Sequence, residues 1–334
     1  MSTPLSGLVS PPTSTAVSAA DQASAAAATS AGVQVRALTE LSELDAVYHL
    51  YDSIWRPDPK NPPVTTELLR ALTKAGNYVS GAYDGTELVG ACVGFFAAPA
   101  EVSMHSHVAG VSTTARGRNI GFALKLHQRA WALERGITAI SWTFDPLIRR
   151  NAYFNLVKLA AHPAEYLTNF YGGMHDSINN GDDTDRLLVR WDLDTPAVTK
   201  AATAHSQPLT IQSYPQATIA LTRAPNDHPA PGSNAHTVAG AAVHTVAGAA
   251  AHSVPGAPAH PPRPGVAPLT SNIVLVAVPP DIESLRRTNP TAAKSWRSAL
   301  RDVLGGLLAD GAQVIGFDRT GWYVLELPAR GLTR

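Results

Sequence analysis

The dipeptide Asp84-Gly85, which separates two apolar runs, most limits what this chain can fold into. The runs are Tyr78–Tyr83 and Glu87–Phe95. Asp-Gly between apolar runs predicts a β-hairpin, because the tight turn needs positive φ, which glycine adopts without steric cost. Another strand is predicted at Val102–Val111, and it leads through a glycine-bearing turn into a long helix. These elements predict a mixed α/β domain.

Further elements extend this domain over residues 33–195. Hydrophobic periodicity and capping residues mark them, and Gly136 is expected to close the long helix that runs to Arg135. They are a strand at 33–38, a helix with Leu41, Leu44, Val47, Tyr48 and Tyr51 on one face, a short helix from Thr65/Thr66, a strand at 137–144, a helix at 149–161 and strands near 166–171 and 186–193.

The segments on either side have different compositions. Residues 1–32 are mostly Ser, Ala, Thr and Pro, so we predict a disordered tail that cannot bury enough apolar surface to offset chain entropy. Residues 196–270 carry few charges and are interpreted as a flexible linker, with one strand possible at 209–221. Residues 271–334 predict a small β-α-β-β unit that packs on the main domain.

An eight-residue repeat lies in the predicted linker. Its histidines are His236, His244, His252 and His260. Regular histidine spacing permits a metal-binding interpretation. The alternative is a repeated flexible linker, which the absence of accompanying carboxylates and cysteines favours.

Charge and cysteine usage exclude several classes of function. Lys+Arg and Asp+Glu both total 26, so the net charge is zero. Polyanion binding draws on clustered positive charge, so nucleic acids and anionic membranes are not expected partners. The single cysteine, Cys92, excludes an intramolecular disulfide framework and is predicted to be a small buried hydrophobe. No apolar run is long enough for a membrane helix, and the N-terminal stretch lacks basic residues before Arg36, so a cytoplasmic location is predicted.

The turn after the 102–111 strand carries the chemistry of an anion site. It contains Arg116, Gly117, Arg118 and Gly121, and the following helix starts at about Ile120. Backbone N–H groups at a helix N-terminus bind anions, small residues let a phosphate approach, and arginines add charge-assisted hydrogen bonds. The spacing therefore predicts a cradle for a diphosphate.

The pattern Val111-x-x-x-x-Arg116-Gly117-x-x-x-Gly121 resembles the acyl-CoA-binding signature of the GNAT N-acyltransferases. Other stretches are similar to one predicted-acetyltransferase branch of that superfamily: Leu124–Trp131, Trp142–Leu147, Asn151–Asn155, Asn169–Gly172, Asp185–Trp191 and, in a C-terminal extension, Trp296–Arg301. The resemblance covers residues 33–195 and implies the GNAT fold, a mixed, mostly antiparallel sheet with helices on both faces. The expected fold class is thus α/β, with that domain followed by the small β-α-β-β unit.

The resemblance also implies where acyl-CoA, with acetyl-CoA as the default donor, would bind. It assigns the cofactor-binding role to Gly110, Val111, Arg116, Gly117, Arg118, Asn119, Ile120, Gly121 and Asn151. In that fold the fourth and fifth strands splay, CoA lies in the gap, and a backbone N–H near Gly110–Val111 faces the thioester carbonyl. Asn119 departs from the family, which usually has glycine there. Asparagine tolerates left-handed φ better than most residues, so the cradle can survive.

Two histidines are the candidate bases. His105 and His107 are two residues apart on one strand and so point to the same face. An imidazole suits proton removal from an ammonium near neutral pH. The pattern His-x-His-Val-x-x-Val is similar to the paired histidines of arylalkylamine N-acetyltransferases. Three roles stay open: general base or proton relay, substrate positioning, and a zinc site without an evident third ligand.

The general acid is less defined by the sequence. Many GNAT enzymes have a tyrosine on the helix after the fifth strand, and Leu156 occupies that position here. Tyr153 is the predicted substitute, with water or the proton from the amine as alternatives. Asp145 either helps to place an amine or caps the next helix.

These observations predict an acyl-CoA-dependent N-acyltransferase that acts on a small-molecule amine or an amino acid by direct attack in a ternary complex. No metal is expected. The alternatives are a non-catalytic acyl-CoA-binding module and a protein lysine acetyltransferase.

Overall fold

A computed structural model describes residues 11–57, 62–98, 101–172, 183–203, 209–225, 227–232 and 272–328. The chain forms two compact units. The first comprises residues 1–146 and 150–207, and the second comprises residues 147–149 and 208–334. The eight-residue repeat at 236–260 lies outside the described residues. In the described part of the chain no helix has the length and apolar character needed to cross a membrane.

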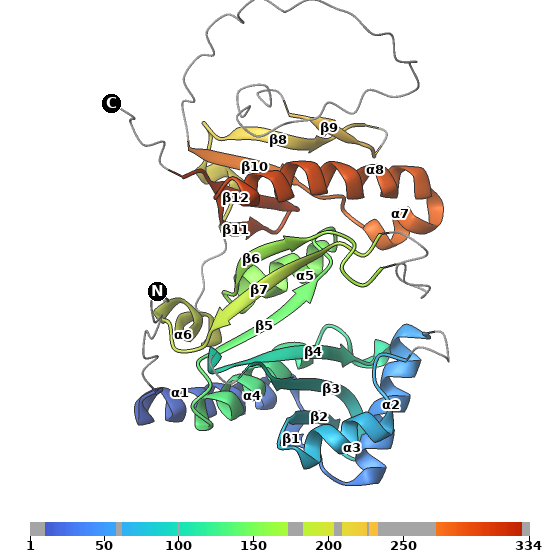
Figure 1. Cartoon of the computed structure of the whole chain (residues 1–334), viewed down its shortest axis with the longest axis vertical. Helices are drawn as coiled ribbons and strands as arrows, with labels where there is room; N and C mark the ends of the chain where they lie inside the picture. Colours follow the sequence, from blue (N-terminus) through green and yellow to red (C-terminus); the bar gives the residue numbers. More distant parts are fainter. Residues whose placement is uncertain are drawn as a thin grey trace, which may run out of the picture. The chain divides into compact units, whose positions relative to one another are not determined.

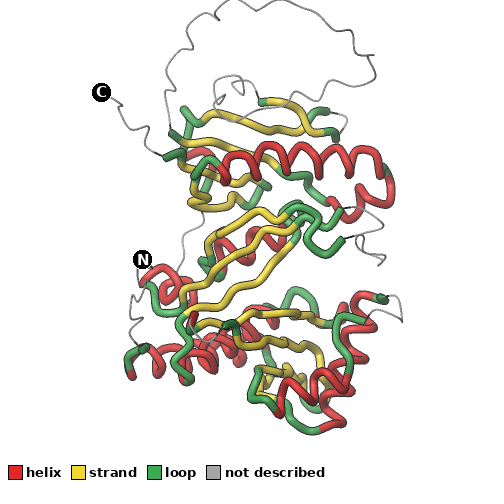
Figure 2. The backbone as a smooth tube through the Cα atoms, in the orientation of Figure 1, coloured by secondary structure: helices red, strands yellow, loops and turns green. Residues whose placement is uncertain are grey.

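The first unit is built on a seven-stranded sheet with the order β1-β2-β3-β4-β5-β7-β6 (Figures 1 and 2). Neighbouring strands are antiparallel except β4 and β5, which are parallel. The predicted mixed, mostly antiparallel sheet is therefore confirmed. The strands are β1 (Gln34–Ala37), β2 (Tyr78–Asp84), β3 (Glu87–Phe96), β4 (Ser103–Val111), β5 (Ala139–Phe144), β6 (His162–Leu167) and β7 (Arg186–Asp192).

Helices pack on both faces of this sheet. One face contacts α2 and α3, and the other contacts α4, against which α1 packs. The helices of the unit are α1 (Ser14–Ala31), α2 (Leu41–Trp55), α3 (Thr66–Lys74), α4 (Ile120–Glu134), α5 (Arg149–Tyr153), which continues as a π-helical turn (Phe154–Lys158), and α6 (Pro196–Ala202); a 3-10 turn (Thr113–Ala115) precedes α4.

Strand alternation explains how one sheet supports both helical layers. Val79 and Val93 belong to the apolar cluster formed with α2 and α3. Their neighbours Tyr78 and Cys92 point to the opposite face, where the Tyr78 hydroxyl lies 2.8 Å from Nδ1 of His127 on α4. Cys92 is fully buried, as predicted. The predicted turn is also present, because Gly85 has a φ of 59°.

The prediction of a disordered tail at 1–32 was wrong for residues 14–31, which form α1. Alanine is the best helix former, and both ends of the helix are capped. Thr13 accepts a hydrogen bond from the Ala16 N–H at 3.2 Å, and Gly32 ends the helix in the left-handed conformation. Small residues bury little apolar area, but they let α1 pack closely on α4, with Ala20 only 1% exposed.

The linker prediction for 196–270 was wrong at its N-terminal end. Residues 196–202 form α6, and residues 218–223 and 229–231 form strands of the second unit. Apolar side chains explain this order, since Ala220 and Leu221 are buried. The strand predicted within 209–221 is thus present, displaced toward the C-terminus. The second unit is accordingly larger than the predicted β-α-β-β unit.

The second unit contains a five-stranded sheet with the order β11-β12-β10-β8-β9. Asn289 caps α8 by accepting a hydrogen bond from the Ala292 N–H at 3.1 Å, with Pro290 at the first helical position, as predicted. Trp296 of α8 is fully buried. The elements are β8 (Thr218–Arg223), β9 (Pro229–Pro231), β10 (Ile273–Ala277), α7 (Ile282–Thr288), α8 (Pro290–Leu300), a π-helical turn (Arg301–Gly305), α9 (Gly306–Ala309), β11 (Gln313–Asp318) and β12 (Trp322–Glu326), with a 3-10 turn at Ile211–Ser213.

The packing of α1 on α4 makes a testable prediction. Ala20→Asp places a carboxylate in that interface and should lower the free energy of unfolding by about 1–3 kcal/mol. Ala19→Asp is the matched control, because Ala19 is exposed on the same helix and loses the same helix propensity. Denaturant unfolding and hydrogen exchange of residues 14–31 measure the difference. Equal effects of the two substitutions would contradict the packing of α1.

Candidate active site

Strands β4 and β5 pair over a short stretch and then part. Their register joins Ser103 to Ala139, Met104 to Ile140 and His105 to Ser141, and the ladder ends there. Both strands continue, β4 to Val111 and β5 to Phe144. From Ser106 onward β4 therefore pairs with β3 alone, and its other backbone edge faces the space between the diverging strands (Figure 1).

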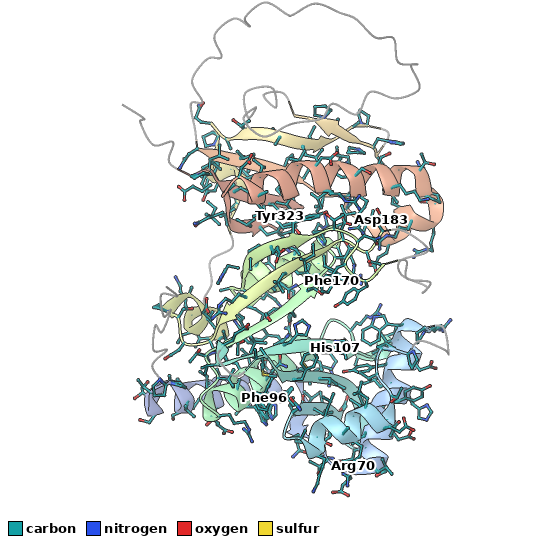
Figure 3. The ribbon with its side chains drawn as sticks, in the orientation of Figure 1. Arg70, Phe96, His107, Phe170, Asp183 and Tyr323 are labelled. Atoms are coloured by element: carbon teal, nitrogen blue, oxygen red, sulfur yellow. The ribbon has the colours of Figure 1, made fainter. Side chains whose placement is uncertain are left out.

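A β-bulge lies where the strands part. On β3, Val93 pairs with Val108 and Gly94 pairs with Ser106, so His107 is the extra residue of β4. A bulge bends its strand and re-aims the side chain of the extra residue. His107 is exposed on β4 (Figure 3).

The two candidate histidines share one face, as predicted. Their ring centroids are 6.3 Å apart, and both rings contact Phe95. Burial, the neighbouring His107 and the ammonium of Lys125 lower the pKa of His105 to about 4. His105 is thus a neutral imidazole at physiological pH, able to accept a proton or hydrogen bond.

Two residues of the predicted phosphate loop have a left-handed backbone. Gly117 has a φ of 87° with open space at its Cβ position, and Asn119 has a φ of 62° and caps α4. The expectation that asparagine would tolerate the glycine position is therefore confirmed. The first hydrogen bonds of the helix run from the N–H groups of Phe122 and Ala123 to the Asn119 carbonyl. The N–H groups of Ile120 and Gly121 precede these bonds, at the helix N-terminus where backbone amides can bind an anion.

The two arginines of the loop differ in what their side chains do. Arg116 is exposed. The Arg118 guanidinium donates to Asp84 Oδ2 at 2.5 Å and to the carbonyls of Ala31 and Gly32 at 3.2 and 3.1 Å. The Arg118 side chain thus joins the loop to the end of α1 and to the β2–β3 turn, and its assignment as a cofactor ligand stays a prediction. Its backbone remains part of the loop.

The end of β4 is shaped by α2. A Cβ at Gly110 would lie 2.7 Å from the Trp55 ring, so only glycine lets α2 pack this closely. The Tyr51 hydroxyl donates to the Val108 carbonyl at 3.3 Å, which ties α2 to the residue after the bulge. These contacts fix the segment from His107 to Val111 from the side opposite α4.

The remaining predicted residues lie around α5 and the end of β5. Asn151 and Tyr153 are both partly exposed on α5, and Leu156, at the usual tyrosine position, is buried. Asp145 is only 5% exposed, which leaves little of its surface for a diffusing amine. The assignments of Asn151, Tyr153 and Asp145 remain predictions.

Two lysines near the site were not found from the sequence. Lys158 Nζ donates to Asn119 Oδ1 at 2.6 Å and thus brings a cation to the loop. Lys125 is buried beneath β4, where its Nζ donates to Ser106 Oγ at 2.7 Å. A signal for Lys125 was present, because Lys125, Gln128 and Arg129 have helical spacing on a helix that is apolar on several sides.

The zinc alternative gains no support from the described residues. Nowhere among them do three or more His, Cys, Asp or Glu side chains gather closely enough to hold a metal ion. The expectation that no metal takes part stays a prediction.

The topology of the first unit matches the one that the sequence resemblance implies. A mostly antiparallel sheet is interrupted by one parallel pair, β4 and β5, which splay, and β4 leads through a left-handed turn into α4. The first unit has the GNAT fold.

No protein-family profile and no curated protein sequence matches the chain. Solved structures that resemble it include the ribosomal-protein-S18-alanine N-acetyltransferase of Escherichia coli, with a TM-score of 0.38 and 13% identity over 49% of this chain and 95% of that one. The ribosomal-protein-alanine N-acetyltransferase of Brucella melitensis gives 0.39 and 19% over 47% and 98%. Salmonella typhimurium yncA, solved with its cofactor acetyl-CoA, gives 0.40 and 14% over 49% and 96%.

The left-handed conformation of Asn119 can be tested by comparing two substitutions. Asn119→Gly and Asn119→Ala both remove the hydrogen bond from Lys158, but only alanine places an unfavourable Cβ at positive φ. We expect Asn119→Ala to unfold with a free energy about 1 kcal/mol lower than that of Asn119→Gly. Denaturant titration of both variants measures this difference. Equal stabilities would show that the turn does not hold this residue in the left-handed region.

Proposed function

We propose that this protein is an acyl-CoA-dependent N-acyltransferase that transfers an acyl group, acetyl by default, to the primary amine of a small molecule or amino acid. One observation carries the proposal. β4 parts from β5 directly after His105, and its free edge then runs from the bulged His107 to the left-handed turn that starts α4. A cradle for phosphate and a pair of imidazoles thus lie at the two ends of one short strand segment.

The loop would hold the diphosphate of the acyl-CoA. The backbone amides from Gly117 to Gly121 and the guanidinium of Arg116 supply the donors and the positive charge. Lys158 adds a second cation through its contact with Asn119. With the diphosphate there, the pantetheine arm would follow the free edge of β4 toward His107, and Asn151 would contact the arm from α5.

The proposed reaction has one bond made and one broken. His107, or a relay through His105, takes a proton from the substrate ammonium, and the neutral amine attacks the thioester carbonyl carbon. The oxyanion that forms would accept a hydrogen bond from a backbone N–H near Gly110–Val111, and one such donor is worth roughly 10²–10³ in rate. Collapse expels the CoA thiolate, and the nitrogen loses its extra proton to give the amide. The thiolate takes up that proton, or one from Tyr153 or from water.

Binding of the donor should depend on Arg116. Arg116→Ala should raise the dissociation constant of acetyl-CoA about tenfold, because a charge-assisted contact to the diphosphate is lost. Arg135→Ala is the control, since Arg135 is an exposed arginine at the other end of α4. Calorimetry with acetyl-CoA, succinyl-CoA and free CoA measures the affinities and identifies the preferred donor. Unchanged affinity in Arg116→Ala would show that the phosphate cradle is wrongly placed.

Turnover should depend on His107. His107→Ala should lower kcat by roughly 10²–10⁴ while leaving acetyl-CoA affinity unchanged. The loss should shrink at high pH, where more of the amine is already deprotonated in solution. Release of the CoA thiol, followed with a panel of alkylamines, amino acids and lysine peptides, measures turnover and separates small-molecule from protein acceptors. His49→Ala, at an exposed histidine of α2, is the control.

The pH dependence separates the two histidines. The pKa of His105 is about 4, so this ring stays neutral as the pH falls from 8 to 5. If kcat/KM falls as the pH is lowered toward 5, the group that becomes protonated must therefore be another one than His105.

The alternative function, an acyl-CoA-binding module without catalysis, predicts that acetyl-CoA binds but that no amine in the panel causes release of CoA.

A further inference from the structure

A buried ammonium lies on the α4 side of the sheet where β4 and β5 part. Lys125 is 5% exposed. Its Nζ donates to Ser106 Oγ at 2.7 Å and to Gln128 Oε1 at 3.0 Å, and it lies 3.9 Å from the centre of the Trp142 ring. A hydroxyl, an amide oxygen and an indole face thus surround one positive charge.

The register of the two strands shows that Lys125 lies where their pairing ends. The last paired residues are His105 and Ser141. The next pair in the same register would be Ser106 of β4 with Trp142 of β5, and that pair does not form. Lys125 contacts both of these residues. Its ammonium therefore bridges the strands at the first position where the ladder is open.

The charge is costly where it lies. In the part of the chain that the structure describes, the ammonium has no carboxylate partner. Burial lowers the pKa of Lys125 to about 8, with the thiol of Cys92 on β3 acting in the opposite direction. An apolar side chain would fill such a space at lower cost, because desolvation of an ion is not recovered from neutral partners. Packing alone therefore does not explain why a lysine occupies this position.

The ammonium is also next to the candidate bases along the strand. Ser106, its hydrogen-bond partner, separates His105 from His107, and these two rings lie on the opposite face of β4. The charged and titratable groups that act on His105 are His107 from its own strand and Lys125 from α4, and both lower its pKa.

We propose that Lys125 is a positioning residue of the acyl-transfer site: its ammonium, bonded to Ser106 of β4 and placed over the Trp142 ring of β5, sets the spacing of the two strands at the apex of the gap. The proposal rests on the proposed function and deepens it. It assigns the opening of the gap to a polar contact between α4 and the two strands, in addition to the bulge at His107.

Lys125→Met tests the proposal, because methionine keeps most of the volume and removes the charge. Acyl transfer should show a kcat roughly ten- to a hundredfold lower, with a smaller change in KM for acetyl-CoA, since misplacement of reacting groups acts mainly on the chemical step. The NMR titration of His105 should also move to higher pH, because one of the positive charges that lower its pKa is removed. Lys74→Met, at an exposed lysine of α3, is the control for loss of one charge.

Ser106→Ala separates the contact from the charge. It removes the hydroxyl that anchors the ammonium but keeps the lysine, so kcat should fall while the titration of His105 stays close to that of the wild type. Wild-type kcat in Lys125→Met would overturn the proposal, whether or not the titration of His105 moves. If Lys125→Met does not fold, wild-type kcat in Ser106→Ala would overturn it. A wild-type protein that transfers no acyl group would instead overturn the proposed function itself.

Discussion

The candidate site depends on a sheet ladder that stops after three residue pairs. A parallel pair of strands in the middle of a sheet normally hydrogen-bonds along its whole length, and each unpaired backbone group away from water has a cost. Here β4 and β5 give up that pairing beyond His105 and Ser141. Beyond His105 this edge of β4 is not paired with β5, and the proposed acyl-CoA site lies along it.

Several contacts hold β4 in place beside the gap between β4 and β5. The bulge at His107 bends β4, α2 packs its Trp55 ring directly on Gly110, and the Tyr51 hydroxyl bonds to the Val108 carbonyl. On the other face, Lys125 bridges β4 and β5. These contacts come from β3 and α4, which are next to β4 in the chain, and from the distant helix α2, so the shape of the gap is a property of the packed domain.

The phosphate loop shows a similar dependence on distant parts of the chain. Its turn needs positive φ at Gly117 and Asn119, a local requirement, but the Arg118 side chain connects it to the carbonyl end of α1 and to Asp84. A cation at the C-terminus of a helix is favoured by the helix dipole. The alanine-rich helix α1 is therefore part of the domain that carries the loop.

The sequence by itself determined the hairpin at Asp84-Gly85, the strand–turn–helix from His105 onward and the shared face of His105 and His107, because turn chemistry and strand alternation are local. The left-handed conformation of Asn119 agrees with the glycine that the resembled family has there, since few other residues tolerate that conformation. Only the tertiary structure decided that residues 14–31 form a packed helix, that Arg118 points away from the loop and that Lys125 is buried. Those outcomes depend on which surfaces meet in the folded domain. Composition and periodicity do not specify this, and for Lys125 they gave only the helical spacing that it shares with Gln128 and Arg129.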